Sequence, residues 1–184
     1  AKNSIVKELG AVRRDIEKAN GYIKTYDDDI RDSLWGDLRE ATDAVNVAEE
    51  QLKESKPDYI VIVKAIKSAH AKVDKILDEA RSEHEAVQRL REKLASALRD
   101  AKSAVSRAKE YIDDHRSDVE RSAKNLLASA TTNLELADRV QNMNKKLEIL
   151  EAVGSDANSA YKKAKQNFED AEDARRPTYS SYSC

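Results

Sequence analysis

Glycine, proline, aromatic residues and cysteine are all scarce in this chain, and each shortage excludes a class of structure. The 184 residues include 4 Gly and 2 Pro, and aromatic residues make up 5%, so turn formers and β formers are both rare. The one cysteine, Cys184, is the last residue, which excludes an internal disulfide and a cysteine metal cluster. No apolar run approaches the length of a membrane span, since YIVIV at 59–63 is far too short.

An excess of charge of one sign is also lacking, although charged residues make up 37% of the chain. The 33 basic and 35 acidic residues leave a formal net charge of −2. A protein that binds nucleic acid needs a basic face that displaces counterions from phosphate, and no basic block of this kind occurs. The sequence begins at Ala1 without Met or a signal-peptide pattern, so we expect a fragment or a processed form.

The chain is rich in apolar residues at helical spacing, set among Ala, Leu, Lys, Glu and Arg, which favour helices. One set alternates four and three residues apart and consists of Ile5, Leu9, Val12, Ile16, Ala19, Ile23 and Tyr26. A second set resumes this rhythm with Leu34, Leu38, Ala41, Val45, Ala48 and Leu52. This heptad pattern is typical of helices that pack side by side, and it predicts an all-α fold.

The heptad phase slips across a triple aspartate, and the acidic stretch DDHRSD follows at the equivalent place in the second half. We interpret both places as helix breaks, at about 27–30 and 114–117, where acidic residues cap the next helix and suit its dipole. Ser117 stands three residues before Glu120, which is the spacing of a capping box. The alternative is an unbroken helix with a coiled-coil stutter at each place.

The two halves of the chain repeat at an offset of 89 residues. Identical pairs are Ala19/Ala108, Tyr22/Tyr111, Ile23/Ile112, Asp29/Asp118, Ser33/Ser122, Leu38/Leu127, Ala41/Ala130, Thr42/Thr131 and Ala48/Ala137. Most of these pairs fall on apolar positions at helical spacing, where chance matches are common, so the shared Tyr-Ile and the shared acidic break carry the most weight. We infer an internal duplication of roughly 90 residues per unit.

Pro57-Asp58 starts a helix, and after Pro57 no Gly or Pro occurs until Gly154. This segment has Ile, Ala, Val, Leu or Tyr at 62, 66, 69, 73, 76, 80, 87, 90, 94, 97, 101, 104, 108 and 111. The gap in this series is Glu83, in the most polar part of the run. The pattern predicts a continuous helix that changes its packing partners near Glu83.

The expected fold is therefore two tandem antiparallel three-helix bundles, of the spectrin-like kind, that share a long continuous central helix. The first bundle takes residues 1–82 and the second takes 83–175, followed by a flexible Ser/Tyr tail at 176–184. The last turn of the second bundle falls either at 142–145 or at Gly154, where Ser155 and Asp156 would cap a new helix.

The chain also resembles a known family. The pattern "A..YI....-D-V...A...L..A...L..A" is carried by Ala108, Tyr111, Ile112, Val119, Ala123, Leu127, Ala130, Leu134 and Ala137, and less fully by residues 19–48 with Pro57-Asp58. It is similar to the helical region C-terminal to the TPM domain in bacterial membrane-anchored proteins. The resemblance covers most of residues 10–175. It implies a helical appendage of a cell-envelope protein, attached to the membrane through an upstream segment, and it assigns no catalytic residue.

No catalytic, cofactor-binding or metal site is predicted. Di-iron bundles use Glu-x-x-His pairs, and none of His70, His84 and His115 has Glu three residues before it, so we interpret these histidines as residues of solvated helix faces. The triple aspartate lacks the alternating ligands and the Gly of a calcium loop. No Gly-rich phosphate loop or nucleophile elbow is present.

The residues singled out for interaction are Trp35, Tyr59, Ile60, Val61, Tyr179 and Tyr182. Trp35 either caps one end of a bundle core or anchors a partner, since Trp is enriched in interface hot spots. Residues 59–61 make more than one face of their helical turn apolar. They either bury a partner helix or a neighbouring subunit, or they belong to a wider bundle core.

We predict a non-enzymatic helical spacer and protein-interaction module of a cell-envelope or self-assembling protein, with a protein partner or a second copy of itself. The alternatives are a helical bundle that binds an apolar ligand or lipid, and a regulatory appendage of a TPM-domain protein.

Overall fold

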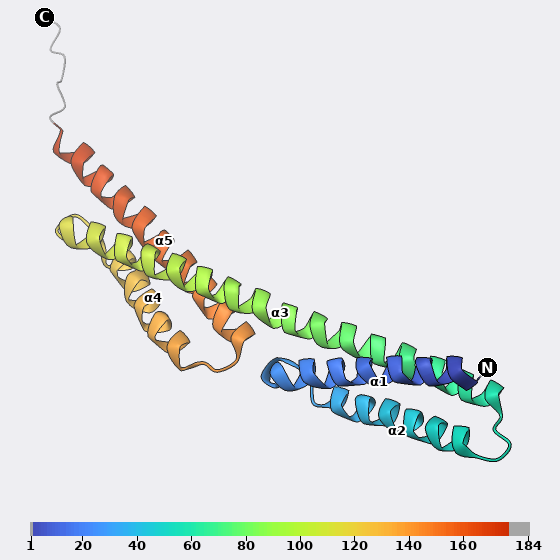
Figure 1. Ribbon diagram of the computed structural model, residues 1–184. Helices are drawn as coiled ribbons and strands as arrows, with labels where there is room; N and C mark the ends of the chain where they lie inside the picture. Colours follow the sequence, from blue (N-terminus) through green and yellow to red (C-terminus); the bar gives the residue numbers. More distant parts are fainter. Residues whose placement is uncertain (1, 177–184) are drawn as a thin grey trace, which may run out of the picture. The chain divides into compact units, whose positions relative to one another are not determined.

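The computed structural model describes residues 2–176, and within that range every regular element is helical. The helices are α1 (Lys2–Thr25), α2 (Ser33–Lys53), α3 (Tyr59–Asp114), α4 (Arg121–Arg139) and α5 (Met143–Arg175), with a short 3₁₀ helix, η1, at Asp27–Asp29. Figure 1 shows their order along the chain. The all-α prediction is confirmed.

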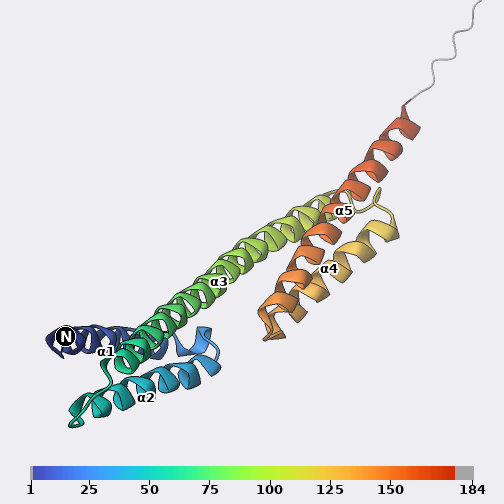
Figure 2. The ribbon, with the colours of Figure 1, turned by 90° about the vertical axis from the view of Figure 1, so that its right-hand side faces the viewer.

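The chain divides into two compact units, Ala1–Gln88 and Arg89–Cys184. Unit 1 contains α1, α2 and the first part of α3, and unit 2 contains the rest of α3 with α4 and α5. Within each unit the helices lie side by side in both ribbon views (Figures 1 and 2). The boundary predicted between residues 82 and 83 falls in α3, within unit 1.

The core of unit 1 is built on the predicted heptad positions, and three helices contribute to it. One cluster consists of Ile5, Leu9, Val12, Val45, Ala48, Leu52, Ile62, Ile66 and Ala69. A second consists of Ala19, Ile23, Ile30, Leu34, Leu38, Ala41, Val73, Ile76 and Ala80. All six positions predicted for α2 are buried, and each large aliphatic side chain stabilises the fold by about 1.5–3 kcal/mol.

The core of unit 2 is dominated by alanine. Its clusters consist of Ala101, Ala104, Val105, Ala130, Ala137, Leu150, Val153 and Ala157, and of Ala108, Ile112, Val119, Ala123, Ala160 and Ala164. They draw on α3, α4 and α5. Because alanine is small, the helix backbones must approach closely to leave no voids. Unit 2 therefore has little room for larger side chains at these positions.

Both predicted helix breaks are real turns, so the stutter alternative is wrong. In unit 1, α1 ends at Thr25 and α2 begins at Ser33. In unit 2, α3 ends at Asp114, which is the position 89 residues after Thr25, and α4 begins at Arg121. The two breaks thus follow the sequence repeat.

The capping box predicted at Ser117 is wrong. The backbone N–H groups of Asp118 and Val119 both donate to the carbonyl of His115, so the chain turns once more before α4 can start. The residue before α4 is Glu120, whose side chain makes no capping bond. Its backbone N–H donates instead to Oδ1 of Asn167 in α5, at 3.2 Å. Tertiary contact therefore replaces the local cap.

The last turn lies at residues 140–142, so the first of the two alternatives, 142–145, is placed about two residues too late and shares Asn142 with the observed turn. Asn142 caps α5, since its Oδ1 accepts a hydrogen bond from the backbone N–H of Lys145 at 3.0 Å. Gly154 lies inside α5 with negative φ, so the alternative of a break there is wrong. A cap at the preceding turn and apolar contacts on either side of Gly154 outweigh a penalty of about 1 kcal/mol for one glycine in a helix.

Candidate interaction surface

The first turn of α3 exposes the three apolar residues predicted for interaction. Asp58 caps this turn, because its Oδ1 accepts hydrogen bonds from the backbone N–H groups of Ile60 (3.0 Å) and Val61 (3.2 Å). The next residue, Ile62, is fully buried, whereas Ile60 is 70% exposed and Tyr59 and Val61 are also exposed. Burial of one face thus leaves an apolar edge open to solvent.

An apolar groove of about 480 Å³ lies beside this turn, lined by residues of α1 and α3. Its lining consists of Ser4, Ile5, Glu8, Tyr59, Ile60, Val63 and Lys64. Ile5 belongs to the core of unit 1 and Val63 packs against it, so the groove is continuous with that core. Glu8 and Lys64 add one charge of each sign. An apolar floor with a polar rim is the usual composition of a protein-binding surface.

The sequence pattern predicts one wall of this groove, residues 59–61, and does not predict the other. The pattern assigns Ile5 to the core and gives no sign that it also meets the exposed turn at 59–61. That contact exists because the start of α1 lies beside the start of α3 (Figure 1). Val6, which follows Ile5, is also exposed.

Trp35 lies in α2, away from the groove. It is half-buried and packs against the second core cluster of unit 1, while its indole N–H donates to Oδ1 of Asp27 at 2.8 Å. It also lines a shallow groove of about 410 Å³ with Ile16 and Leu38. Both predicted roles, core cap and partner anchor, remain predictions. Tyr179 and Tyr182 lie outside the described residues.

A polar cluster that the sequence did not reveal joins η1 to α3 within unit 1. Oδ2 of Asp29 lies 2.8 Å from Nδ1 of His84 and accepts a hydrogen bond from Nε2 of Gln88 at 3.2 Å. The side chain of Asp29 is 6% exposed and that of His84 is 17% exposed. The predictions that this aspartate caps α2 and that His84 lies on a solvated face are therefore wrong, because η1 places the carboxylate against α3.

Aromatic rings accompany this cluster, and unit 2 contains a related ring pair. The rings of His84 and Tyr26 stack with centroids 3.9 Å apart, and burial raises the pKa of the neighbouring Tyr22 hydroxyl. At the positions equivalent to Tyr22 and Tyr26, Tyr111 and His115 stack with centroids 4.3 Å apart. His115 is half-buried, so the prediction of a solvated face is wrong for it as well.

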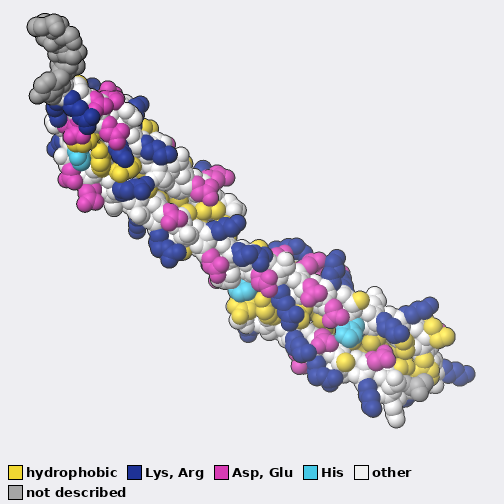
Figure 3. All heavy atoms as spheres, turned by 90° about the horizontal axis from the view of Figure 1, so that it is seen from above, with side chains coloured by type: hydrophobic (Ala, Val, Ile, Leu, Met, Phe, Trp, Pro, Cys, Tyr) yellow, Lys and Arg dark blue, Asp and Glu magenta, His cyan; other side chains and the backbone are white. Residues whose placement is uncertain are grey.

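Charged pairs on the surface of unit 1 connect its helices. The guanidinium of Arg13 in α1 donates two hydrogen bonds of 2.6 Å to the carboxylate of Glu49 in α2, which lowers the pKa of Glu49. Lys72 of α3 donates to Glu40 of α2 at 2.5 Å and lowers the pKa of that carboxyl. In Figure 3 charges of both signs are interspersed with hydrophobic patches over the visible face. These pairs connect neighbouring helices, and they do not position a side chain for catalysis.

The described residues thus define an all-helical protein whose first unit carries an exposed apolar groove. Comparison with protein-family models, curated proteins and solved structures finds no match to this chain. None of the described helices is both long enough and apolar enough to cross a membrane.

Proposed function

We propose that the chain is a non-enzymatic helical spacer and protein-interaction module, and that the groove at the start of α3 is its binding surface. The observation that carries the proposal is the exposure of Ile60 and its two neighbours beside a groove that reaches the core. Exposed apolar residues grouped at one place mark interaction sites more often than single ones do. A protein partner or a second copy of the chain would bury this edge.

The architecture we propose is two tandem antiparallel three-helix bundles, of the spectrin-like kind, joined through α3. It is supported by the residues that α3 contributes to all four core clusters. Residues 81–100 of α3 include no fully buried residue, and their partly buried side chains are held by polar contacts to unit 1 at His84 and by packing on the core of unit 2 at Leu94 and Leu98. A spacer of this kind would hold two binding partners at a set distance.

Paired spin labels test the spacer. Ser68 and Ser103 are exposed residues of α3, and cysteines at both places in a Cys184→Ser chain give a labelled pair. A straight helix separates the two α-carbons by about 52 Å, at 1.5 Å per residue. A narrow distance distribution near that value supports the proposal. A broad or much shorter distribution refutes a continuous central helix.

Sedimentation equilibrium tests the binding surface. We expect the wild-type chain to self-associate as its concentration rises, and Ile60→Asp to abolish this, because a charge in an apolar contact is costly to bury. Leu136→Asp is the matched control, since Leu136 is an exposed apolar residue of unit 2. Equal association of wild type and Ile60→Asp would exclude this surface. A strictly monomeric wild-type chain would exclude self-association and leave a different protein as partner, to be captured by a photocrosslinker at position 60.

Ligand binding is a second candidate function, favoured by a groove of about 480 Å³ in unit 2. Ile112, Leu127 and Ala128 supply apolar surface. The lining also has three basic residues and one acidic residue, Lys109, Arg116, Lys124 and Asp113, so its net charge is positive. This combination suits an amphiphile with an anionic head. Thermal stabilisation by oleate that is lost in Lys109→Gln would support it, and no stabilisation would exclude it.

The resemblance to the helical region of TPM-domain proteins suggests where such a module would act. We propose a cell-envelope setting in which an upstream segment attaches the chain to a membrane and the helices serve as a regulatory appendage. The gene tests this directly: a TPM domain and a membrane span encoded upstream of Ala1 would support the proposal, and a different upstream domain would exclude it.

A further inference from the structure

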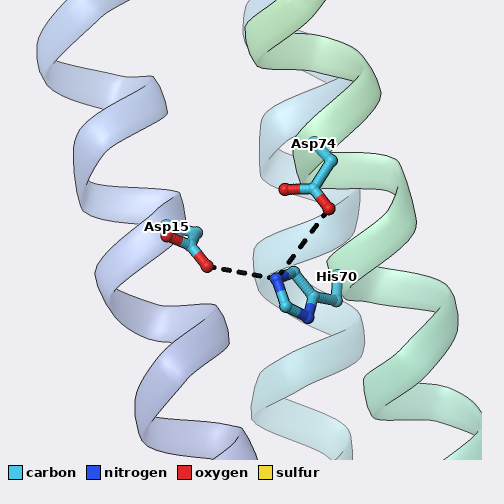
Figure 4. A group of neighbouring side chains, drawn as sticks. All are labelled: Asp15, His70 and Asp74. Carbon is cyan, nitrogen blue, oxygen red and sulfur yellow. Dashed lines mark ion pairs between the residues drawn. The ribbon is translucent and has the colours of Figure 1, made fainter.

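Three side chains of unit 1 converge at a place that the interaction surface does not use. Asp15 of α1 faces His70 and Asp74 of α3, and Figure 4 shows both carboxylates directed at the imidazole. Nε2 of His70 lies 3.1 Å from Oδ2 of Asp15 and 3.9 Å from Oδ2 of Asp74. His70 and Asp74 are one helical turn apart, so the helix itself presents them on one face.

The donor set and its spacing suit a transition-metal ion. A zinc ion takes imidazole nitrogen and carboxylate oxygen at about 2.0–2.2 Å, so ligand atoms in its tetrahedral shell lie about 3.4 Å apart. The three potential ligand atoms all lie within 4.8 Å of one another, so small side-chain rotations bring them to that spacing. Imidazole favours zinc over magnesium, which prefers an all-oxygen shell.

A neighbouring lysine already orients one of the carboxylates. Nζ of Lys18 donates to Oδ1 of Asp15 at 3.0 Å, which leaves Oδ2 for His70. Outer contacts of this kind fix the ligands of metal sites.

We propose that Asp15, His70 and Asp74 bind a divalent transition-metal ion, Zn²⁺ above the others, with water completing the shell. Asp15 comes from α1 and the other two ligands from α3, so the ion links these helices within unit 1. Because His70 and Asp74 are well exposed, the ion enters without any opening of the core.

Calorimetric titration of the full chain with Zn²⁺ tests the site. Every variant carries Cys184→Ser, which removes the one competing thiol. We expect one Zn²⁺ per chain, weakened at least about tenfold by His70→Gln and by Asp15→Asn, because each removes a ligand. Asp78→Asn is the matched control: it removes the same charge from an exposed position one turn further along α3, and the affinity should stay within about twofold.

A second readout identifies the ligand directly. The imidazole resonances of His70 should shift on addition of Zn²⁺, return with a chelator, and stay unchanged with Mg²⁺. The proposal is overturned if the chain binds no Zn²⁺, or if His70→Gln and Asp15→Asn bind it as tightly as wild type. Circular dichroism confirms that each variant is folded, which the exposure of His70 leads us to expect.

Discussion

Asp29→Asn is the substitution that most directly tests the polar cluster between η1 and α3. It preserves the size of the side chain and removes the negative charge that faces His84. The asparagine amide has one neutral acceptor oxygen for His84 and Gln88. The aspartate carboxylate has two acceptor oxygens that share a negative charge. The side chain is almost fully buried, so water cannot compensate.

The expected cost follows from this burial. A hydrogen bond to a charged group contributes about 1.5–3 kcal/mol. His84 retains some exposure, which reduces the effect, so we expect unit 1 to lose about 2 kcal/mol of stability. For a folding unit of this size the loss lowers Tm by about 8–16 °C.

Fluorescence of Trp35 is the assay, because the sole tryptophan lies in unit 1 and reports the unfolding of that unit. The matched control is Asp28→Asn, which removes the same charge from an exposed position of the same 3₁₀ helix and should change stability by less than about 0.5 kcal/mol. If Asp29→Asn unfolds at the same urea concentration as Asp28→Asn, the cluster does not stabilise unit 1.

Three further predictions concern other contacts. Glu49→Gln removes the partner of Arg13 and should cost about 0.5–1 kcal/mol at pH 7 in urea denaturation, because the pair is partly exposed. The pKa of Glu49 is lowered in the folded state, so its contribution to stability is present above the unfolded pKa and is lost as the pH falls through the folded pKa. A difference in stability between Glu49→Gln and wild type that persists at pH 2 would contradict this. Ala130→Leu should destabilise unit 2 by about 1–3 kcal/mol through overpacking, measured by calorimetry, and a stabilised variant would show that the core has spare volume. Asn142→Ala should cost about 1 kcal/mol through loss of the cap to Lys145, whereas Asn142→Ser should not, and equal losses by circular dichroism would exclude capping.

Helix positions and core residues could be read from the sequence because they depend on a period. A helix buries one face, so heptad spacing alone places Leu34 to Leu52 in the core, and all six of these positions are buried. The breaks were predictable for the same reason, since a change of phase requires a turn or a stutter. Periodicity carries no information on how two helices are displaced along each other.

That displacement decides the features that were missed. His84 meets Asp29 because η1 lies about seven helical turns along α3, a placement that depends on both loops. The groove beside Tyr59 depends likewise on where α1 starts relative to α3. Ser117 had the spacing of a cap, yet Asn167 of α5 supplies the contact to Glu120. Local sequence patterns thus predict local structure, whereas contacts between distant segments become visible only in the folded structure.

The alanine content of the two cores has a mechanical consequence. Among the described residues, alanine supplies nine of the fourteen fully buried core residues of unit 2 and five of the eighteen of unit 1, so the fully buried core of unit 2 removes less apolar area from water. We expect unit 2 to yield first when the chain is stretched. The protein would then lengthen in two steps, because unit 2 would unfold at a lower force while unit 1 remains folded.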